Sequence, residues 1–526
     1  MSAQDQGKQA PMHAAPASPS GLRPWWETRW FVAAMIFISA IPLLYPPIPP
    51  LVDLFGHLGR YRVELDLATS PWLKEYYGFQ WAAIGNLGVD ILVIPLAKIF
   101  GLELAVKLIV LAIPPMTVAG FLWVAREVHG RIPPTALFAL PFAYSHPFMF
   151  GFVNFALSIA LAFLAFGLWL RLARQGRLKL RALLFVPISL VVFFTHTFGW
   201  GVLGLLCFSG EAIRQHDRGM GWFKSAPWAA LHASVMALPA LIILEWRSGI
   251  QGATAGQWFV WHLKWEAVTS ALRDQWQLFD WLSLALVTLL ILYAIFSRWL
   301  TLSRNLAFSA LVLAAVFVAL PGRIFSSAYA DMRLLPFVFV LSVLAIRFKG
   351  ETYLPLARRL AVIGLAFFLV RIGAHTLSFA MAADDQRAKL TALDHVPMGA
   401  LVLSFNGRTC GTDWPMERNS HLGAMVIVRR HGFSNDQWIT QGVNLLRLNG
   451  NPAGLLSSDP SGIVRPNHCH NRGWWIDRAL REVGRQPEGA VDYVWLIDPP
   501  PYDIRLVDGM RPVWRDRRSV LYQVQP

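Results

Sequence analysis

The residues best suited to chemistry lie in one short segment near the start of the chain. Asp53, His57, Arg60 and Glu64 are separated by four, three and four positions, so in a helix all four lie on one face. A carboxylate beside an imidazole can take a proton from a hydroxyl group as a general base, and an arginine can hold an anion through paired hydrogen bonds. Asp53 and His57 are therefore candidate catalytic residues, and Arg60 is a candidate for substrate binding. The alternative is a solvated helix face joined by internal ion pairs.

The other side of the same segment is apolar. Leu54, Leu58 and Leu65 lie away from the polar face, as in a helix that rests on a membrane surface. The pattern predicts an interfacial helix within a loop over residues 48–81.

Two further turns contain a histidine between apolar runs. His146 lies in Tyr144-Ser145-His146-Pro147, and His196 lies in Phe194-Thr195-His196-Thr197-Phe198. A histidine in or beside a membrane span is costly unless it faces a polar cavity, so both are candidates for substrate binding. The alternative for each is a histidine that caps a helix or bonds to a backbone carbonyl.

A fourth polar segment contains Arg323, Asp331 and Arg333. Two arginines with one aspartate suit a phosphate or diphosphate, with Asp331 orienting an arginine fork. The alternative is a set of water-facing anchors that end a span. Arg371 and His375, in the last apolar run, form a weaker pair whose side chains can extend outward.

Several common catalytic motifs are missing from the sequence. It has no P-loop, dinucleotide-binding glycine motif, Cys-x-x-Cys pair or Gly-x-Ser-x-Gly motif where one could work. Asn467-His468-Cys469-His470 resembles a metal-ligand cluster but has no partner cluster. Cys410 and Cys469 form a disulfide if the tail is in an oxidising compartment, or stay as thiols. No ATP hydrolysis is implied, so an activated, lipid-linked substrate is the natural source of energy.

The composition indicates what positions these residues. Of 526 residues, 55% are hydrophobic and 15% are charged, against roughly 25% charged in soluble proteins. Charged residues are about twice as frequent after Asp385 as before it. This predicts a mainly α-helical, multi-pass membrane protein followed by one soluble domain. The apolar runs that suit spans of about 20 residues lie near 30–45, 82–100, 103–125, 134–150, 152–170, 182–197, 198–213, 226–244, 278–297, 305–321, 334–346 and 360–380.

The basic residues predict the orientation of these spans. A net charge of +15 would suit a protein that binds nucleic acid. Most basic residues before the tail, however, form clusters between apolar runs, as they do in cytoplasmic loops. We therefore expect no nucleic-acid partner. All clusters lie inside if only one crossing falls between residues 80 and 126, which makes 82–100 re-entrant or interfacial. This predicts about eleven spans, a cytoplasmic N-terminus and an extracytoplasmic tail. The clusters are Arg126/Arg131, Arg171/Arg174/Arg177/Lys179/Arg181, Arg214/Arg218/Lys224, Arg298/Arg304 and Arg347/Lys349/Arg358/Arg359.

The chain divides into three parts on these grounds. Residues 1–28 are rich in Gln, Ala, Pro and Ser and are predicted to be disordered and cytoplasmic. Residues 29–383 form the membrane domain, and 384–526 form a small α/β domain outside the membrane. In the tail, short apolar runs suit buried strands at Gly399–Phe405, Met425–Val428 and Tyr493–Asp498, and 437–446 and 473–483 suit helices.

The arrangement resembles the GT-C superfamily of glycosyltransferases, which use polyprenyl-phosphate sugars, and a group of bacterial GT-C-like membrane proteins. Asp53-x-x-x-His57-x-x-Arg60, the His196 turn and Asp331-x-Arg333 carry the resemblance. It implies that Asp53 is the base that deprotonates an acceptor hydroxyl. It also implies basic residues beside the donor phosphate, where Arg323 and Arg333 would lie. The localisation it implies is the bacterial inner membrane, with a cell-envelope glycan, lipid or protein as the acceptor.

The resemblance leaves the metal requirement open. Some members of the superfamily use a paired acidic motif with a divalent cation, Mg²⁺ or Mn²⁺. Glu64-Leu65-Asp66 could serve, although its position does not clearly match that motif.

Other functions fit parts of the sequence. A transporter or flippase of lipid-linked precursors would line its path with intramembrane polar residues, although related halves are often visible in such proteins and none are here. A polysaccharide polymerase or ligase would also use outer arginines and histidines. A non-catalytic scaffold is a further alternative.

Overall fold

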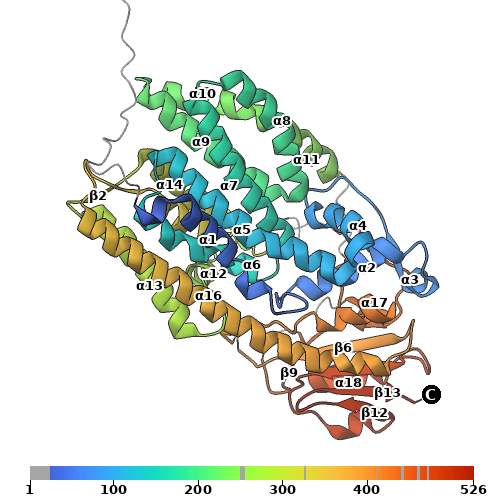
Figure 1. Cartoon of the computed structure of the whole chain (residues 1–526). Helices are drawn as coiled ribbons and strands as arrows, with labels where there is room; N and C mark the ends of the chain where they lie inside the picture. Colours follow the sequence, from blue (N-terminus) through green and yellow to red (C-terminus); the bar gives the residue numbers. More distant parts are fainter. Residues whose placement is uncertain are drawn as a thin grey trace, which may run out of the picture.

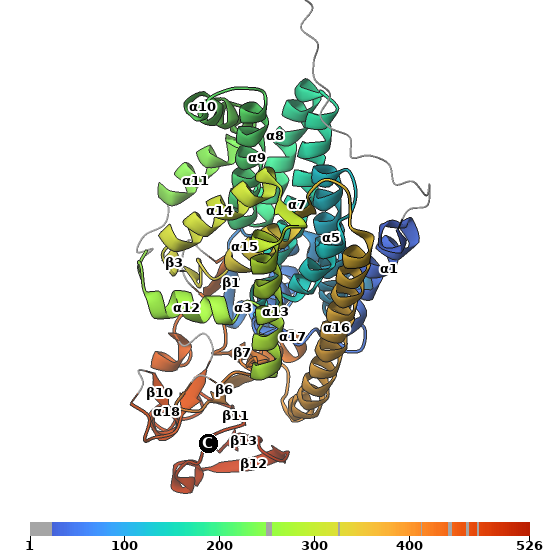
Figure 2. The ribbon, with the colours of Figure 1, turned by 90° about the vertical axis from the view of Figure 1, so that its left-hand side faces the viewer.

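The computed structural model describes residues 24–248, 255–324, 327–411, 413–439, 444–458, 462–470 and 473–525. These residues form a helical bundle with a sheet-containing domain at one end (Figure 1). The sheet lies at the opposite end of the molecule from α8, α9 and α10 in both views (Figure 2). The predicted class, a mainly helical membrane protein with a small C-terminal sheet domain, is confirmed.

Among the described residues, five helices are long and apolar enough to cross a membrane. A sixth span is possible if the bent pair α10 and α11, which kinks by 66°, crosses as one unit. Shorter apolar helices cover 29–43, 304–319 and 335–344, so several spans are established but the predicted number of about eleven stays a prediction. The long helices are α5 (Leu102–His129), α7 (Val153–Arg174), α8 (Leu178–Thr195), α13 (Gln277–Phe296) and α16 (Leu354–Leu390); α10 is Trp222–Ala233 and α11 is Leu238–Ser248.

The remaining helices of the bundle pack around this framework. Helix α7 is the most enclosed of the long helices, and it packs against α5 and α9. The other helices are α1 (Arg29–Ile38), α9 (Thr197–Asp217), α12 (Trp261–Thr269), α14 (Arg304–Ala319) and α15 (Leu335–Leu344).

One predicted span is not an α-helical crossing. Residues 134–144 form the 3₁₀ helix η3, followed by the four-residue helix α6 (His146–Met149), and all of them are buried. Prolines 133, 134, 141 and 147 have no N–H group to donate and therefore interrupt regular α-helical bonding. The segment is a buried, irregular part of the bundle, and its crossing of the membrane stays a prediction.

The segment expected to be re-entrant is short. Helix α4 (Gly88–Phe100) has 13 residues, fewer than the roughly 20 that a regular crossing needs. The residues before it, from 80 to 87, form no helix or strand. The structure thus has no regular span over 82–100.

The predicted interfacial helix forms, but its surroundings differ from the prediction. Helix α2 (Leu54–Asp66) packs against α5 and against the tail helices η6 (Leu422–Ala424) and α17 (Met425–Arg430). Leu54 and Leu58 are fully buried, so they pack in protein rather than on lipid. Helix α2 is therefore part of the junction between the bundle and the tail.

The tail contains a mixed sheet with strand order β10-β9-β6-β11-β13-β12, and β7 pairs with β6. β6 is parallel to β7, β9 and β11, while β13 is antiparallel to β11 and β12. Helix α18 (Ile476–Val483) lies within the predicted helical stretch 473–483. The strands are β6 (Leu401–Gly407), β7 (Phe433–Ser434), β9 (Ile463–Arg465), β10 (Trp474–Trp475), β11 (Tyr493–Ile497), β12 (Met510–Arg515) and β13 (Val520–Val524).

Two tail predictions were wrong in detail. Met425–Val428 belongs to helix α17, because a short buried apolar run does not distinguish a strand from a helix. The helix predicted over 437–446 is absent from 437–439 and 444–446, and 440–443 lie outside the described residues. Instead, β8 (Leu446–Leu448) pairs antiparallel with β1 (Tyr77–Phe79), which joins the tail to the segment over residues 48–81.

Candidate functional site

Asp53 lies at the N-terminal end of α2, where its backbone is held by a neighbouring turn. Its N–H donates to the carbonyl of Phe150 at 2.9 Å. Gly151 follows with φ +92°, and a Cβ there would lie 2.7 Å from the nitrogen of Asp53. The Asp53 side chain makes no capping hydrogen bond to α2, so its carboxylate is available for contacts across the junction.

The Asp53 carboxylate contacts a histidine of the tail. His421 Nε2 lies 3.5 Å from Asp53 Oδ1, and His421 Nδ1 lies 2.6 Å from Asp436 Oδ1. All three residues are buried. Burial disfavours a charged ring, but the two carboxylates outweigh it and raise the pKa of His421 to about 10. Asp53, His421 and Asp436 therefore form a chain of two carboxylates joined by an imidazolium.

Sequence reasoning missed His421 and Asp436. The two residues lie in irregular segments with no periodic spacing. In the sequence each is an isolated polar residue of the tail, and an isolated histidine or aspartate is usually a structural residue rather than part of a site.

His57 lies beside these three residues, but the imidazole that joins the two carboxylates is that of His421. Its ring lies 5.2 Å from that of Trp438 and 6.3 Å from that of Tyr61, and Trp438 also packs against His421 at 4.5 Å. Burial, then the charges of Arg60 and His421, lower the pKa of His57 well below its usual value. His57 is therefore neutral, and its catalytic role stays a prediction.

Arg333 and His196 meet beneath the same junction. Arg333 Nη1 lies 3.3 Å from His196 Nε2, and its guanidinium lies 4.1 Å from the ring centre of Phe152. Arg333 and His196 are buried, and Arg333 is close enough to Asp53 for their charges to interact. The structure thus brings together Asp53, His196 and Arg333, which the sequence places far apart.

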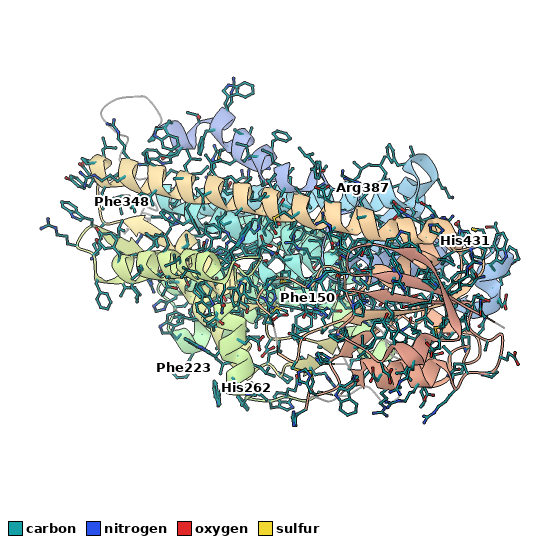
Figure 3. The ribbon with its side chains drawn as sticks, turned by 90° about the horizontal axis from the view of Figure 1, so that it is seen from below. Phe150, Phe223, His262, Phe348, Arg387 and His431 are labelled. Atoms are coloured by element: carbon teal, nitrogen blue, oxygen red, sulfur yellow. A yellow bond between two sulfur atoms is a disulfide. The ribbon has the colours of Figure 1, made fainter. Side chains whose placement is uncertain are left out.

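His146 lies beside this group. Its backbone N–H donates to the carbonyl of Ala271 at 3.2 Å, and its buried ring lies 6.0 Å from the ring of Phe150. Phe150, labelled near the middle of Figure 3, packs 5.2 Å from Tyr329. Within the described residues the Nδ1 atom of His146 has no hydrogen-bond partner, so its role in substrate binding stays a prediction.

Arg60 forms a buried ion pair with Asp90. Its guanidinium lies 2.9 Å from Asp90, and Asn154 donates to the same carboxylate at 3.2 Å. Asn154 also accepts from the backbone N–H of Val89 at 2.6 Å. Arg60 therefore joins α2 to α4 and α7, and its role in substrate binding stays a prediction.

The fourth polar segment is only partly as predicted. Asp331 pairs with Lys264 at 3.0 Å, and Lys264 also donates to the carbonyls of Phe317 and Leu320. Asp331 thus holds a lysine rather than orienting an arginine fork. Arg323 is exposed in the two-residue strand β3 (Arg323–Ile324).

A second group of basic residues combines Arg408 and Arg465 from the tail with Arg273 from the bundle. Arg408 pairs with Glu417. Burial, then Arg465, with a smaller effect of Arg273, lowers the pKa of Arg408 to about 9. Tyr329 lies within electrostatic range of Glu266 and Asp53 and of two of these arginines, Arg273 and Arg408.

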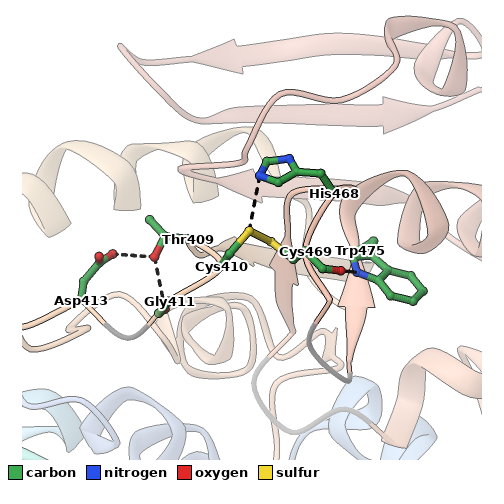
Figure 4. Close-up of a disulfide and its surroundings, with 7 residues drawn as sticks. All are labelled: Thr409, Cys410, Gly411, Asp413, His468, Cys469 and Trp475. Carbon is green, nitrogen blue, oxygen red and sulfur yellow. Dashed lines mark hydrogen bonds between the residues drawn. A yellow bond between two sulfur atoms is a disulfide. The ribbon is translucent and has the colours of Figure 1, made fainter.

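The metal-ligand cluster suggested by the sequence is a disulfide. Cys410 and Cys469 are bonded, and His468 Nε2 lies 3.5 Å from Cys410 Sγ (Figure 4). A bonded sulfur is not a thiolate, and thiolate is the metal-binding form of cysteine. The bond ties the loop after β6 to the loop after β9.

The acidic pair Glu64 and Asp66 does not fit a divalent cation. Burial and the nearby Asp90 raise the pKa of Glu64 to about 8, so that carboxyl group is mostly protonated near neutral pH. Asp66 pairs with Arg62 and lies 3.8 Å from His431 Nε2. Neither carboxyl group is therefore placed as a ligand for a divalent cation.

Arg371 and His375 do not extend outward but belong to a buried network. Arg371 pairs with Asp280 at 2.5 Å, and His375 Nδ1 lies 2.7 Å from Asp274 Oδ2. Arg418, from the tail, pairs with the same Asp274. All five side chains are buried, so the network fastens the tail to the bundle.

Comparisons with known proteins give a distant structural likeness. No protein-family model matches the chain, and no curated protein sequence matches it. Two crystal structures of ArnT from Cupriavidus metallidurans are similar over 94% of this chain and 98% of theirs, at 11% identity. The TM-score is 0.48 for the apo form and 0.43 for the form bound to undecaprenyl phosphate. At this level of similarity, function has to be argued from the chain's own residues.

Proposed function

We propose that the protein is an integral-membrane glycosyltransferase that moves a sugar from a polyprenyl-phosphate donor to an acceptor outside the cytoplasm. The observation that carries this proposal is a buried carboxylate, Asp53, within electrostatic range of a buried arginine, Arg333. A general base and a cation for a leaving phosphate are the two groups that such a transfer needs.

The proposed reaction is one displacement with Asp53 as the base. The acceptor hydroxyl gives its proton to Asp53, and its oxygen forms a bond to the anomeric carbon of the sugar. The bond between that carbon and the phosphate oxygen breaks, and its electron pair stays on the phosphate. The products are the glycosylated acceptor and the free polyprenyl phosphate.

Arg333 is the proposed partner of the donor phosphate. Negative charge grows on that phosphate as the bond breaks, and a fixed cation in a buried site stabilises it strongly. His196, at 3.3 Å from Arg333, would help to place the arginine or the phosphate. Arg323 and Arg60 are less suited to the task, because one is exposed and the other is paired with Asp90.

The proposed location is the bacterial inner membrane, with the N-terminus in the cytoplasm and the tail outside. The basic clusters support this orientation by the rule that cytoplasmic loops are positively charged. The Cys410–Cys469 disulfide supports it as well, because such bonds persist in oxidising compartments. A cell-envelope glycan, lipid or protein is the proposed acceptor class.

The test is transfer of labelled sugar by membranes or nanodiscs given a panel of polyprenyl-phosphate sugars. Asp53→Asn keeps the shape of the side chain and removes the base, so transfer should fall by at least about 100-fold, the range of general base catalysis. The matched control is Asp217→Asn, because Asp217 is half-exposed in an ion pair with Arg304. Equal transfer by D53N and the native protein would refute the base assignment. If the native protein transfers no sugar but moves the donors across the bilayer, the transporter alternative replaces this proposal.

A further inference from the structure

We propose that His421, held by Asp436, is a positioning residue for Asp53, so that the tail completes the active site rather than only binding the acceptor. The proposal rests on the glycosyltransferase function above. His421 Nε2 would donate to Asp53 Oδ1 and leave Oδ2 to receive the proton of the acceptor hydroxyl.

Asp436 determines which way the imidazole faces. Its Oδ1 lies 2.6 Å from His421 Nδ1, so that nitrogen is engaged and Nε2 faces Asp53. The backbone N–H of Asp436 donates to Ser434 Oγ at 3.2 Å. The preceding residue, Asn435, exchanges hydrogen bonds with the backbone of Ser404 on β6, at 2.8 and 3.1 Å. Asp436 is thus fixed to the sheet, and through it so is the direction of His421.

The charges around His421 suit a permanent cation. The titratable groups that face it are Asp53 and His57 from α2 and Asp436 from the tail. His57 is neutral, so one imidazolium lies between two carboxylates, and the group carries one net negative charge. A charged donor at Oδ1 holds the Asp53 carboxylate in one orientation and leaves Oδ2 to accept the proton. After the transfer the group is neutral, and no proton has to leave His421.

The close packing at this place restricts movement of α2 against the tail. A Cβ on Gly56 would lie 2.5 Å from the ring of Trp438 and 3.5 Å from His421. Gly56 therefore permits the close approach that puts His421 on Asp53. The alignment of base and imidazole depends on the docked tail, which makes docking a condition of catalysis.

The first experiment compares transfer by His421→Gln and Asp436→Asn with the native protein over pH 5 to 10. Glutamine keeps a hydrogen-bond donor but has no charge. We expect kcat at pH 7 to fall about 10- to 100-fold in H421Q, the range for losing a charge-assisted hydrogen bond, with the donor KM changed less than about 3-fold. In the native protein kcat should begin to fall as the pH approaches 10, where His421 loses its proton, and H421Q should lack this fall. D436N should lie between H421Q and the native protein.

The matched control is His431→Gln. His431 is a tail histidine near the carboxylate of Asp66, and Figure 3 labels it away from Phe150. Its variant should keep the native profile. If H421Q has the native kcat and pH profile while D53N loses transfer, the positioning role is refuted and the glycosyltransferase proposal stands. If D53N keeps native transfer, the base assignment and the positioning role both fail, while sugar transfer itself is demonstrated.

A second measurement does not depend on the donor sugar. Full-length protein with ¹⁵N-labelled histidine in nanodiscs should show one imidazole that is protonated on both nitrogens at pH 8.5. That signal should be absent from H421Q and should become that of a neutral ring in D436N. The absence of any imidazolium at pH 8.5 would overturn the proposal, even if both variants were impaired.

Discussion

The buried network around Asp274 makes a quantitative prediction about how the tail is held. Asp274, in the bundle, pairs with Arg418 of the tail and with His375, and it accepts a hydrogen bond from Ser378 at 2.8 Å. The side chains of Asp274 and Arg418 are only 1% and 5% exposed. Removing one partner of such a pair leaves the other charge buried and costs about 3–5 kcal/mol.

Asp274→Asn should therefore make release of the tail easier by about 3 kcal/mol, or roughly 100-fold in the equilibrium between docked and open forms. The assay is the rate of tryptic cleavage in the tail of nanodisc-embedded protein, which follows the open population when opening is fast relative to cleavage. Arg418→Met should have a similar effect. The double variant should be less destabilised than the sum of the two, because each change then removes the partner that the other leaves unpaired.

The control is the exposed pair Asp217–Arg304, at 2.6 Å with both side chains about half-exposed. Pairs of this kind contribute about 0–1 kcal/mol, so Asp217→Asn should change cleavage by less than about 5-fold. The reasoning is refuted if D274N is cleaved no faster than D217N. It is also refuted if the effects of D274N and R418M simply add.

Two further predictions concern the proposed site. Arg333→Met should lower kcat for sugar transfer by about 100-fold or more, because it removes the cation beside the leaving phosphate. Arg333→Lys keeps a positive charge and should have a kcat between those of R333M and the native protein. Steady-state kinetics check both variants, with D217N as the reference that keeps native activity. Folding raises the pKa of His421 from its usual 6.5 to about 10, so its contribution to docking is complete below pH 6.5 and is lost as the pH rises through 10. Tryptic cleavage of the tail should accelerate over that interval in the native protein, and H421Q should lack this component.

Much of the site was predictable where local spacing carries the information. The helix over Asp53 to Asp66 follows from its periodicity, and a buried histidine or arginine at a span end is a strong signal because lipid penalises unsatisfied polar groups. Those signals singled out His196 and Arg333, which the structure places together. The apolar runs likewise showed that the chain crosses a membrane several times.

The remaining features depend on contacts between distant segments. His421 meets Asp53 only because the tail docks against α2, and no local pattern around residue 421 encodes that docking. The commitment of Arg60 to Asp90 depends on how α4 packs. The 134–150 run has the hydropathy of a span, but its prolines prevent regular helical bonding and it packs inside the bundle.

The length of helix α16 determines how far the tail, and with it the site of the proposed reaction, lies from the bilayer. Between Arg359 and Asp384 it has 24 residues, and Arg371 is the one Asp, Glu, Lys or Arg among them. At 1.5 Å per residue this stretch is about 36 Å long. That length matches a hydrocarbon core of about 30 Å crossed at a tilt. The helix then continues without a break to Leu390, about 10 Å further, and leads into the sheet (Figure 1). A continuous rod of this kind works as a spacer of fixed length. In the proposed reaction, a sugar on a lipid phosphate would then meet the base at the membrane surface without its carrier leaving the bilayer.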